Sequence, residues 1–157
     1  MYYKKYTKPF EPHFVDILAR NICKVDKDEV YASSGYTPKK AILYSILTSN
    51  HLICYFSNDN LLGIGGVAPK SNGDGVPWFL RTELFHFWKK NNRRRFFKSS
   101  QSWIEHMSEY YPAMSNYVDE RNKESITWLK HLGFTFTDKI KYGFLQIPFI
   151  KFEKYNG

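Results

Sequence analysis

The sequence predicts an α/β fold of the α+β kind: a central, mostly antiparallel mixed sheet flanked by helices. Three observations carry this prediction. The chain has 157 residues, of which 43% are hydrophobic and 18% aromatic, enough for one well-packed core. Helical apolar patterns fill the first third, and alternating strands separated by hairpin turns follow. No linker, repeat or low-complexity segment interrupts residues 1–157, so we expect a single domain.

The first third is expected to be helical after a short strand at 2–6. One helix should start near Pro12, and a second should cover 26–32 and end near Gly35. A third has Thr37 as its N-cap and Pro38 as its first residue. Its inward face is expected to consist of Ile42, Leu43, Ile46 and Leu47.

Three strands are expected next, at 51–56, 61–67 and 76–80, joined by polar turns. Gly63, Gly65 and Gly66 lie inside the second of them. A phosphate loop is the alternative explanation for these glycines, but the G-x-G-x-x-G spacing is missing. Close packing of the backbone, or a bulge, is the preferred interpretation.

The second half should contain a long helical region over 82–110, broken near 91–92, and a fifth strand at 114–118. Two final strands are predicted at 134–140 and 144–152. Pro148 favours a bulge or an edge position for the last one.

The most informative segment is residues 116–134. Asn122 stands where an N-cap belongs, and Gly133 stands where a helix must end in a left-handed residue. Between them Ile126, Leu129 and Leu132 share one helical face. An ordinary capped helix between two strands would explain these parts singly. The full pattern Asn-x-x-Ser-x-x-Trp-Leu-x-x-Leu-Gly-Phe resembles the motif that closes the cofactor site in the GNAT superfamily of N-acyltransferases.

This resemblance implies that the fourth and fifth strands splay apart and hold the pantetheine arm of acetyl-CoA between them. Unpaired backbone of the fourth strand would bond the pantetheine amides. The resemblance implies these cofactor-binding residues: Phe79, Leu80, Arg81, Thr82, Asn116 and Asn122. For Asn116, capping of its own turn is an equally good explanation.

Two features depart from the superfamily's pattern. The junction 80–84, where a glycine-rich phosphate loop belongs, has no glycine and contains Glu83. Leu129 stands where many members place the tyrosine that protonates the leaving thiolate, so Tyr142 is our candidate acid, with Tyr117 and His131 as alternatives.

The candidate general base is Glu29, with Asp28 as its alternative. Either residue would lie on the second helix, beside the expected acceptor side of the cleft. A bystander role in solvent is the competing explanation for an acidic residue there.

The net charge of +8 is concentrated at 89–95 and Lys98. Here Arg93, Arg94 and Arg95, together with Arg81, are expected to replace the missing loop by forked contacts with phosphate. A solvated helix end or a nucleic-acid contact is the alternative.

The segments 76–82 and 95–98, taken with the signature helix, also resemble the acetyltransferase-like internal virion proteins of short-tailed phages. The resulting hypothesis is an N-acetyltransferase-like protein that uses acetyl-CoA to acylate an amine of a protein or small molecule. A catalytically inert virion or host-interaction protein is the alternative, and a nucleic-acid-binding module is the third and weakest.

Cys23 and Cys54 are expected to be buried thiols in a reducing compartment. No metal site and no membrane segment are predicted. We therefore expect the protein in the host cytoplasm or inside a virion.

Overall fold

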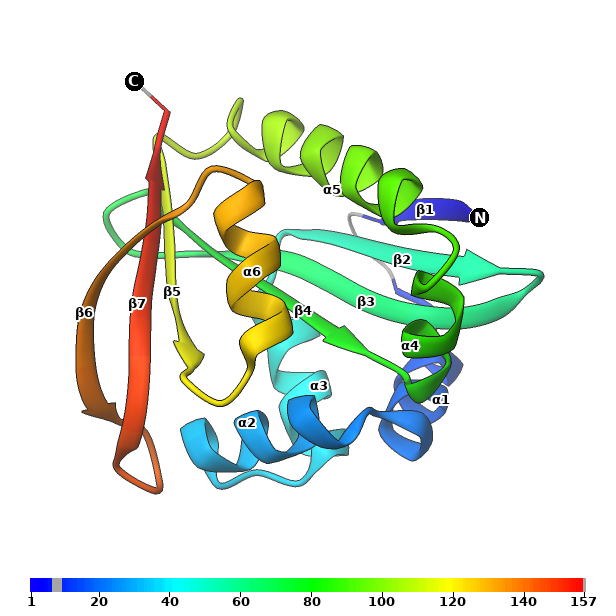
Figure 1. Ribbon diagram of the computed structural model, residues 1–157, viewed down its shortest axis with the longest axis horizontal. Helices are drawn as coiled ribbons and strands as arrows, with labels where there is room; N and C mark the ends of the chain where they lie inside the picture. Colours follow the sequence, from blue (N-terminus) through cyan, green and yellow to red (C-terminus); the bar gives the residue numbers. More distant parts are fainter. Residues whose placement is uncertain (7–9, 157) are drawn as a thin grey trace.

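The structure is a computed structural model that describes residues 1–6 and 10–156. Its seven strands form one sheet in the order β1-β2-β3-β4-β5-β7-β6 (Figure 1). All neighbours are antiparallel except β4 and β5, which are parallel. The predicted fold class is therefore confirmed.

The elements in chain order are β1 (Tyr2–Tyr6), α1 (His13–Asn21), α2 (Lys24–Ser34), α3 (Pro38–Thr48), β2 (His51–Ser57), β3 (Asn60–Pro69), β4 (Gly75–Arg81), α4 (Glu83–Lys89), α5 (Arg93–Met107), β5 (Ala113–Asp119), α6 (Lys123–His131), β6 (Thr135–Tyr142) and β7 (Ile147–Tyr155). The break predicted near residues 91–92 is the short connection between α4 and α5.

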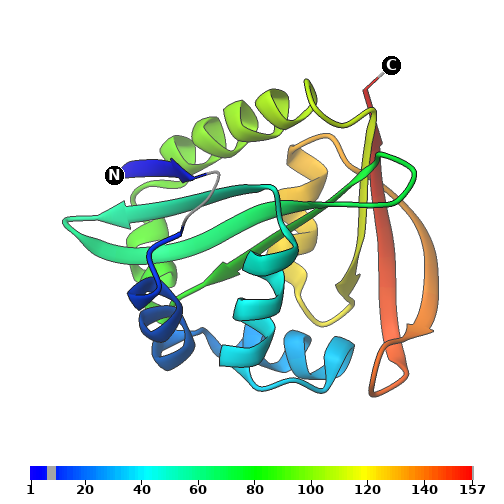
Figure 2. The same cartoon turned by 180° about the vertical axis from the view of Figure 1, so that it is seen from behind.

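Each face of the sheet has its own core. On one face α4, α5 and α6 pack through Phe85, Phe96, Trp103 and Leu129. On the other face α1, α2 and α3 pack through Leu18, Val30 and Ile42 and neighbouring residues. The helix α6 lies in front of the sheet in Figure 1 and α3 lies in front of it in the reverse view of Figure 2.

The strands β4 and β5 separate as predicted. Their only pairing among the described residues is Gly75 with Met114, and from there the two strands diverge (Figure 1). Parallel strands that part in this way leave backbone groups of both edges without a ladder partner. The candidate site is built at this opening.

The glycines of β3 are explained by close packing. A Cβ at Gly63 or Gly65 would stand 2.7 or 2.9 Å from the ring of Phe79 on the neighbouring strand. The ring of Phe79 therefore occupies the space that side chains at these positions would fill, as the packing interpretation requires.

Two details of the predictions are wrong. Leu43 and Leu47 do not face inward: they are 39% and 69% exposed, because α3 packs through Ala41, Ile42 and Ile46 alone. Pro148 does not mark an edge strand, because β7 lies between β5 and β6.

The position of Pro148 has a simple reason. It is the second residue of β7, just beyond the end of β5, where it pairs with Lys141 of β6 and its carbonyl accepts from Glu120 N at 3.2 Å. The strand starts at Ile147, later than predicted, because the turn before it docks on the end of α2: Phe144 and Leu145 donate backbone hydrogen bonds to Ser33 and Ala32.

Candidate active site

A cavity of about 130 Å³ lies between β4, β5, α5 and α6, and is called the inner cavity below. Most of its lining is apolar or aromatic. Its polar side chains include Glu29, Ser100, Asn116 and Ser125. The cavity therefore offers a few polar contacts inside an apolar enclosure, as small-molecule sites commonly do.

The edge of β4 that faces the cavity can be read from the hydrogen bonds at its end. Thr82 N donates to Leu62 O of β3 at 2.9 Å, so Thr82 faces β3. Arg81 faces the other way: its N–H donates to Asp26 Oδ2 at 2.9 Å and its carbonyl accepts from Cys23 N at 2.9 Å.

Backbone groups alternate along a strand, so Pro77 and Phe79 face the same way as Arg81. The carbonyl of Pro77 accepts from Asn116 Nδ2 at 2.9 Å, across the opening between β4 and β5. Between these satisfied residues, the N–H and C=O of Phe79 point into the opening, and no described residue bonds them there. Phe79 thus presents one free donor and one free acceptor at the inner cavity.

Glu29 reaches the cavity from α2. Its Oε1 accepts from the backbone N–H of Asp119 at 2.7 Å, and its Oε2 accepts from Asn122 Nδ2 at 3.3 Å. Burial raises the pKa of Glu29 to about 7, and the nearby carboxylates of Asp26 and Asp119 add to the rise. A carboxylate with such a pKa can accept a proton near neutral pH.

The alternative base, Asp28, points elsewhere. It forms an exposed ion pair with Lys24 at 2.6 Å and does not line the inner cavity. Of the two acidic neighbours on α2, Glu29 is thus the one that reaches the cavity.

A buried ionic network supports this region. Arg81 bonds Asp26 through Nη2 at 2.6 Å and through Nε at 3.0 Å, and it bonds Glu124 through Nη1 at 2.7 Å. Asn122 lies beside the pair, with Oδ1 3.4 Å from Arg81 Nη2. The guanidinium of Arg81 is therefore committed to protein carboxylates.

The signature helix has the predicted ends. Asn122 Oδ1 accepts from Ser125 N at 3.3 Å, which confirms the N-cap, and Gly133 has φ +91° at the other end. Asn122 is 1% exposed and does not line the inner cavity. Its amide thus joins the helix start to Glu29 and Asp26.

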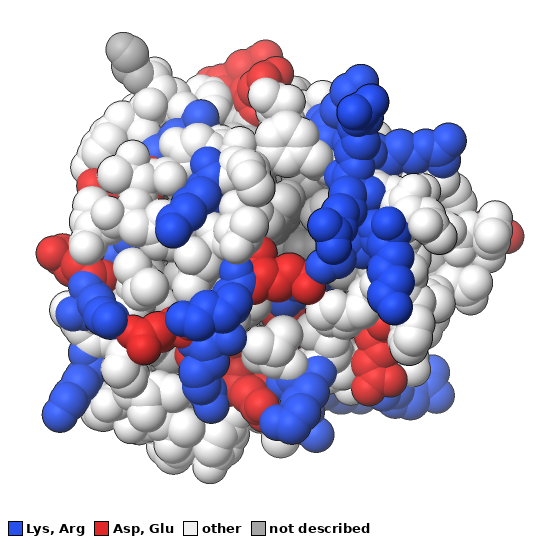
Figure 3. All heavy atoms as spheres, viewed as in Figure 1, with Lys and Arg blue, Asp and Glu red and all other residues white. Residues whose placement is uncertain are grey.

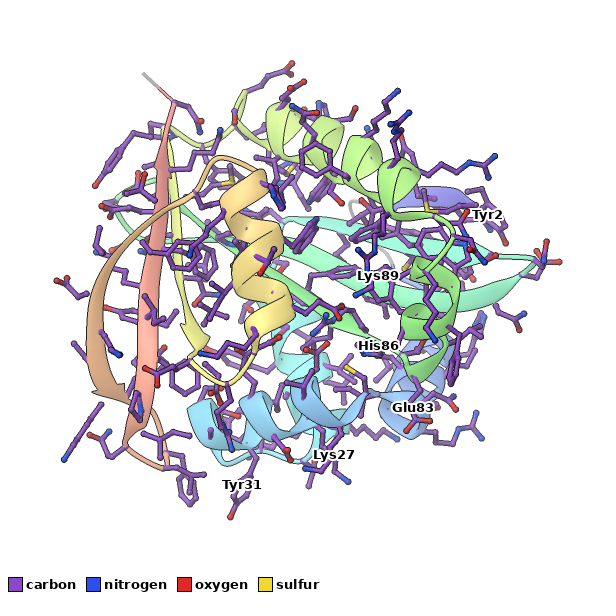
Figure 4. All side chains as sticks on the ribbon, viewed as in Figure 1. Tyr2, Lys27, Tyr31, Glu83, His86 and Lys89 are labelled. Carbon is purple, nitrogen blue, oxygen red and sulfur yellow. The ribbon has the colours of Figure 1, made fainter. Side chains whose placement is uncertain are left out.

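A second pocket, of about 560 Å³, opens between α4, the start of α5 and α6, and is called the basic pocket below. Its charged lining includes Arg81, Lys89, Arg93, Arg94 and Glu124. Figure 3 shows the blue side chains beside a hollow, and Figure 4 shows Lys89 reaching from α4 toward α6. Lys89 Nζ bonds Glu124 at 2.6 Å.

The basic pocket has the features of an anion site. Arg93 and Arg94 are the first residues of α5, whose start has no side-chain cap, so the positive end of the helix dipole adds to their charge. Arg93, Arg94 and Arg95 are all exposed, but only Arg93 and Arg94 line the pocket. The predicted basic run therefore contributes two of its three arginines to the pocket.

Three aromatic rings separate the two pockets. Phe79 and Trp128 line both, and their ring centroids are 5.7 Å apart. Phe96 stacks on Trp128 at 5.3 Å. We call these three side chains the aromatic partition.

The other predicted site residues lie around this centre. Tyr117 lines the inner cavity and Tyr142 stacks behind it at 4.4 Å, where burial raises the pKa of Tyr142. Thr82 is buried, and its hydroxyl donates to Leu61 O and Leu62 O. Leu80 and Leu129 line the cavity.

Sequence reasoning did not single out three site residues: Asp26, Ser125 and Trp128. The last two belong to the signature pattern and could have been singled out there. Asp26 gives no local signal, because its partner Arg81 is 55 residues away.

The comparisons with known proteins agree with this geometry. The family model described as "Bacteriophage T7, probable scaffold protein Gp13" matches residues 52–141, more than half of the chain. The chain belongs to this family. The match runs from β2 to the end of β6 and so includes β4, β5 and the signature helix of this Gp13-family protein.

Solved structures similar to this Gp13-family chain include several that are described as acetyltransferases. Ard1 from Thermoplasma volcanium aligns with a TM-score of 0.70 at 15% identity, covering 98% of this chain and 97% of that one. Aminoglycoside 6'-acetyltransferase type Ii aligns with 0.66 at 14% identity, covering 100% and 98%. RimL, a ribosomal L7/L12 alpha-N-protein acetyltransferase in complex with coenzyme A, gives 0.62 at 13% identity, covering 92% and 87%.

At these identities the similarity shows the GNAT fold and nothing finer. A sequence search of curated proteins gave no match. In the described part of the chain, no helix is both long and apolar enough to cross a membrane.

Proposed function

We propose that this protein is an acetyltransferase-like enzyme that binds acetyl-CoA and acylates an amine of a protein or small molecule. One observation carries the proposal: the unpaired N–H and C=O of Phe79 face the inner cavity, between the basic pocket and Glu29. A strand edge left open in this way binds a ligand amide by strand addition. The buried free backbone groups and the basic lining both fit the cofactor.

The phosphates would bind in the basic pocket. Lys89, Arg93 and Arg94 supply positive charge, and the start of α5 supplies backbone N–H groups in place of the missing glycine loop. In this proposal Arg81 holds Asp26 and Glu124 in place and does not touch phosphate, because its guanidinium already bonds both carboxylates.

The chemistry would take place at the far end of the opening. When bound, acetyl-CoA supplies an acetyl thioester. Glu29 would accept the proton that the attacking amine loses as the new C–N bond forms and the C–S bond breaks. Tyr117, which lines the cavity, or Tyr142 stacked behind it, would return a proton to the departing thiolate.

A second candidate function is supported by the aromatic partition. The rings of Phe79, Phe96 and Trp128 stand between the two pockets. In addition, the carbonyl of Pro77 already accepts a hydrogen bond from the side chain of Asn116. A chain that has lost cofactor binding would serve as a virion or host-interaction protein. The phage family supports this alternative, and either role suits a protein of the host cytoplasm or the virion interior.

The test begins with calorimetric titration of acetyl-CoA into the purified protein. Release of the coenzyme A thiol is then followed with a panel of small amines and amino-terminal peptides. Glu29→Gln should keep acetyl-CoA affinity and lose transfer, whereas the neighbouring exposed variant Asp28→Asn should keep both. Absence of binding at millimolar acetyl-CoA would reject the enzyme and favour the inert alternative.

A further inference from the structure

The indole N–H of Trp128 has no hydrogen-bond acceptor. The Nε1 atom is fully enclosed, yet no described residue accepts from it. Buried donors almost always have partners in native proteins, because water is lost without replacement. An enclosed donor without an acceptor therefore calls for an explanation.

The indole of Trp128 is held in place by the aromatic rings of two neighbouring side chains. Trp128 stacks on Phe96 at 5.3 Å with an interplanar angle of 27°, and Phe79 packs against it at 5.7 Å. By contrast, the indole of Trp78 donates to Ser49 Oγ at 2.7 Å. The fold thus supplies an acceptor for one partly buried indole and leaves the other, at the aromatic partition, without one.

Trp128 lines both the inner cavity and the basic pocket, and Phe79 lines both as well. The partition therefore places the indole ring of Trp128 against the side chain of Phe79, the residue whose N–H and C=O are free, in apolar surroundings. These two donors (the indole N–H and the N–H of Phe79) and one acceptor could form hydrogen bonds with a ligand that contains successive secondary amides and whose charged end lies in the basic pocket. Apolar walls suit the methylene segments between such amides.

Resting on the proposed function, we infer that the rings of the aromatic partition move apart to admit the pantetheine arm, and that the enclosed Trp128 Nε1–H then donates to one of its amide carbonyls. Trp128 is then a ligand-binding residue, and the aromatic partition is a clamp on the arm. The carbonyl belongs to an amide and not to the thioester, because Trp128 lines the basic pocket as well as the cavity and so lies between the two ends of the ligand.

The test follows the indole resonances of protein labelled with ¹⁵N-tryptophan. The chain has four tryptophans, so each indole N–H can be assigned by substitution. Acetyl-CoA and free coenzyme A should both move the Trp128 indole proton downfield, since both contain the amides. The Trp88 indole lines neither pocket, so it should stay in place and serves as the internal control.

Calorimetry of Trp128→Phe should show about tenfold weaker binding of both ligands, the usual effect of losing one buried hydrogen bond. Trp88→Phe is the matched control: Trp88 contacts Phe85 and Phe96 in the same aromatic cluster but lines neither pocket. Its affinity should equal that of the wild type.

The outcomes separate the two proposals. Binding measured by calorimetry without movement of the Trp128 indole would overturn the inference and leave the proposed function standing. A shift seen with acetyl-CoA alone would also overturn it, because the acceptor would then be the thioester. No binding of either ligand to the wild type would reject the proposed function and the inference with it.

Discussion

Arg81 and Asp26 form a buried, two-pronged ion pair that joins the end of β4 to α2. Nη2 and Nε of Arg81 lie 2.6 and 3.0 Å from the two carboxylate oxygens, and the side chains are 4% and 2% exposed. Asp26 also accepts from the backbone N–H of Arg81 at 2.9 Å. Because Glu29 lies one turn further along α2, this pair fixes the helix that presents Glu29 to the cavity.

Asp26→Ala should be strongly destabilising. It leaves the guanidinium of Arg81 buried with only the half-exposed Glu124 to balance it. Removing one partner of a buried pair costs roughly 3–5 kcal/mol of unfolding free energy. Urea denaturation followed by circular dichroism measures this loss.

The exposed pair Lys24–Asp28 on the same helix is the control. Asp28→Ala should cost less than about 1 kcal/mol, as exposed pairs do. Equal losses for the two variants would show that burial of the Arg81 pair contributes nothing.

Glu29 should make stability fall as pH rises. Its pKa in the folded protein is about 7, above the ordinary value of 4.5, so the folded state holds a proton that the unfolded chain has released. Stability is therefore lost between pH 4.5 and 7, by roughly 3 kcal/mol in all.

Glu29→Gln removes this titration. The variant should gain stability relative to the wild type as pH rises from 5 to 8, and the difference should level off above pH 8. Urea midpoints and slopes for both proteins across this range give the comparison. A difference that stays constant with pH would mean that the Glu29 pKa is not raised.

Much of the fold could be predicted from the sequence, because its signals are local. The caps at Thr37 and Asn122 and the first two hairpin turns depend on a few neighbouring residues and are confirmed, whereas the strand after the last turn starts later than predicted. The predicted inward face of α3 included two residues, Leu43 and Leu47, that are exposed. Its apolar residues alone do not show that the sheet covers only Ile42, Ile46 and Ala41.

The site was harder to predict, because its contacts are long-range. Glu29 meets Asp119 and Asn122 about ninety residues away, and no local pattern records that meeting. The role of Arg81 depends in the same way on Asp26. The topology can suggest which residues come close together, but not which of them form hydrogen bonds or ion pairs with one another.

Asn122→Ala should cost more than loss of an ordinary cap. Its side chain caps α6 through Ser125 N and also bonds Glu29 and Asp26 in a buried setting. An exposed cap is worth roughly 0.5–2 kcal/mol, and we expect Asn122→Ala to exceed that range.

Thr37→Ala at α3 is the matched control for Asn122. Its hydroxyl accepts from Lys40 N at the same 3.3 Å but is exposed and shared with no other group. It should stay within the range of an ordinary cap. Thermal or urea unfolding that ranked the two variants equally would argue against the buried role of Asn122.

Binding of acetyl-CoA should depend on the arginines that line the basic pocket. Arg93→Ala/Arg94→Ala removes two of its charges, whereas Arg95→Ala changes a neighbour on the same helix turn that does not line it. The double variant should bind at least tenfold more weakly, since contacts of arginine with phosphate are among the stronger charge-assisted hydrogen bonds. Calorimetry at low and high salt measures both effects.

Salt gives the decisive comparison for the basic pocket. Wild-type affinity should fall as ionic strength rises, because partly exposed charges are screened. The double variant, with fewer charges to screen, should show a shallower dependence, and Arg95→Ala should follow the wild type. If all three proteins bind equally and respond equally to salt, positive charge acts only at long range and the pocket does not hold the phosphates. If only the double variant loses both affinity and salt dependence, the start of α5 has taken the place of the missing glycine loop.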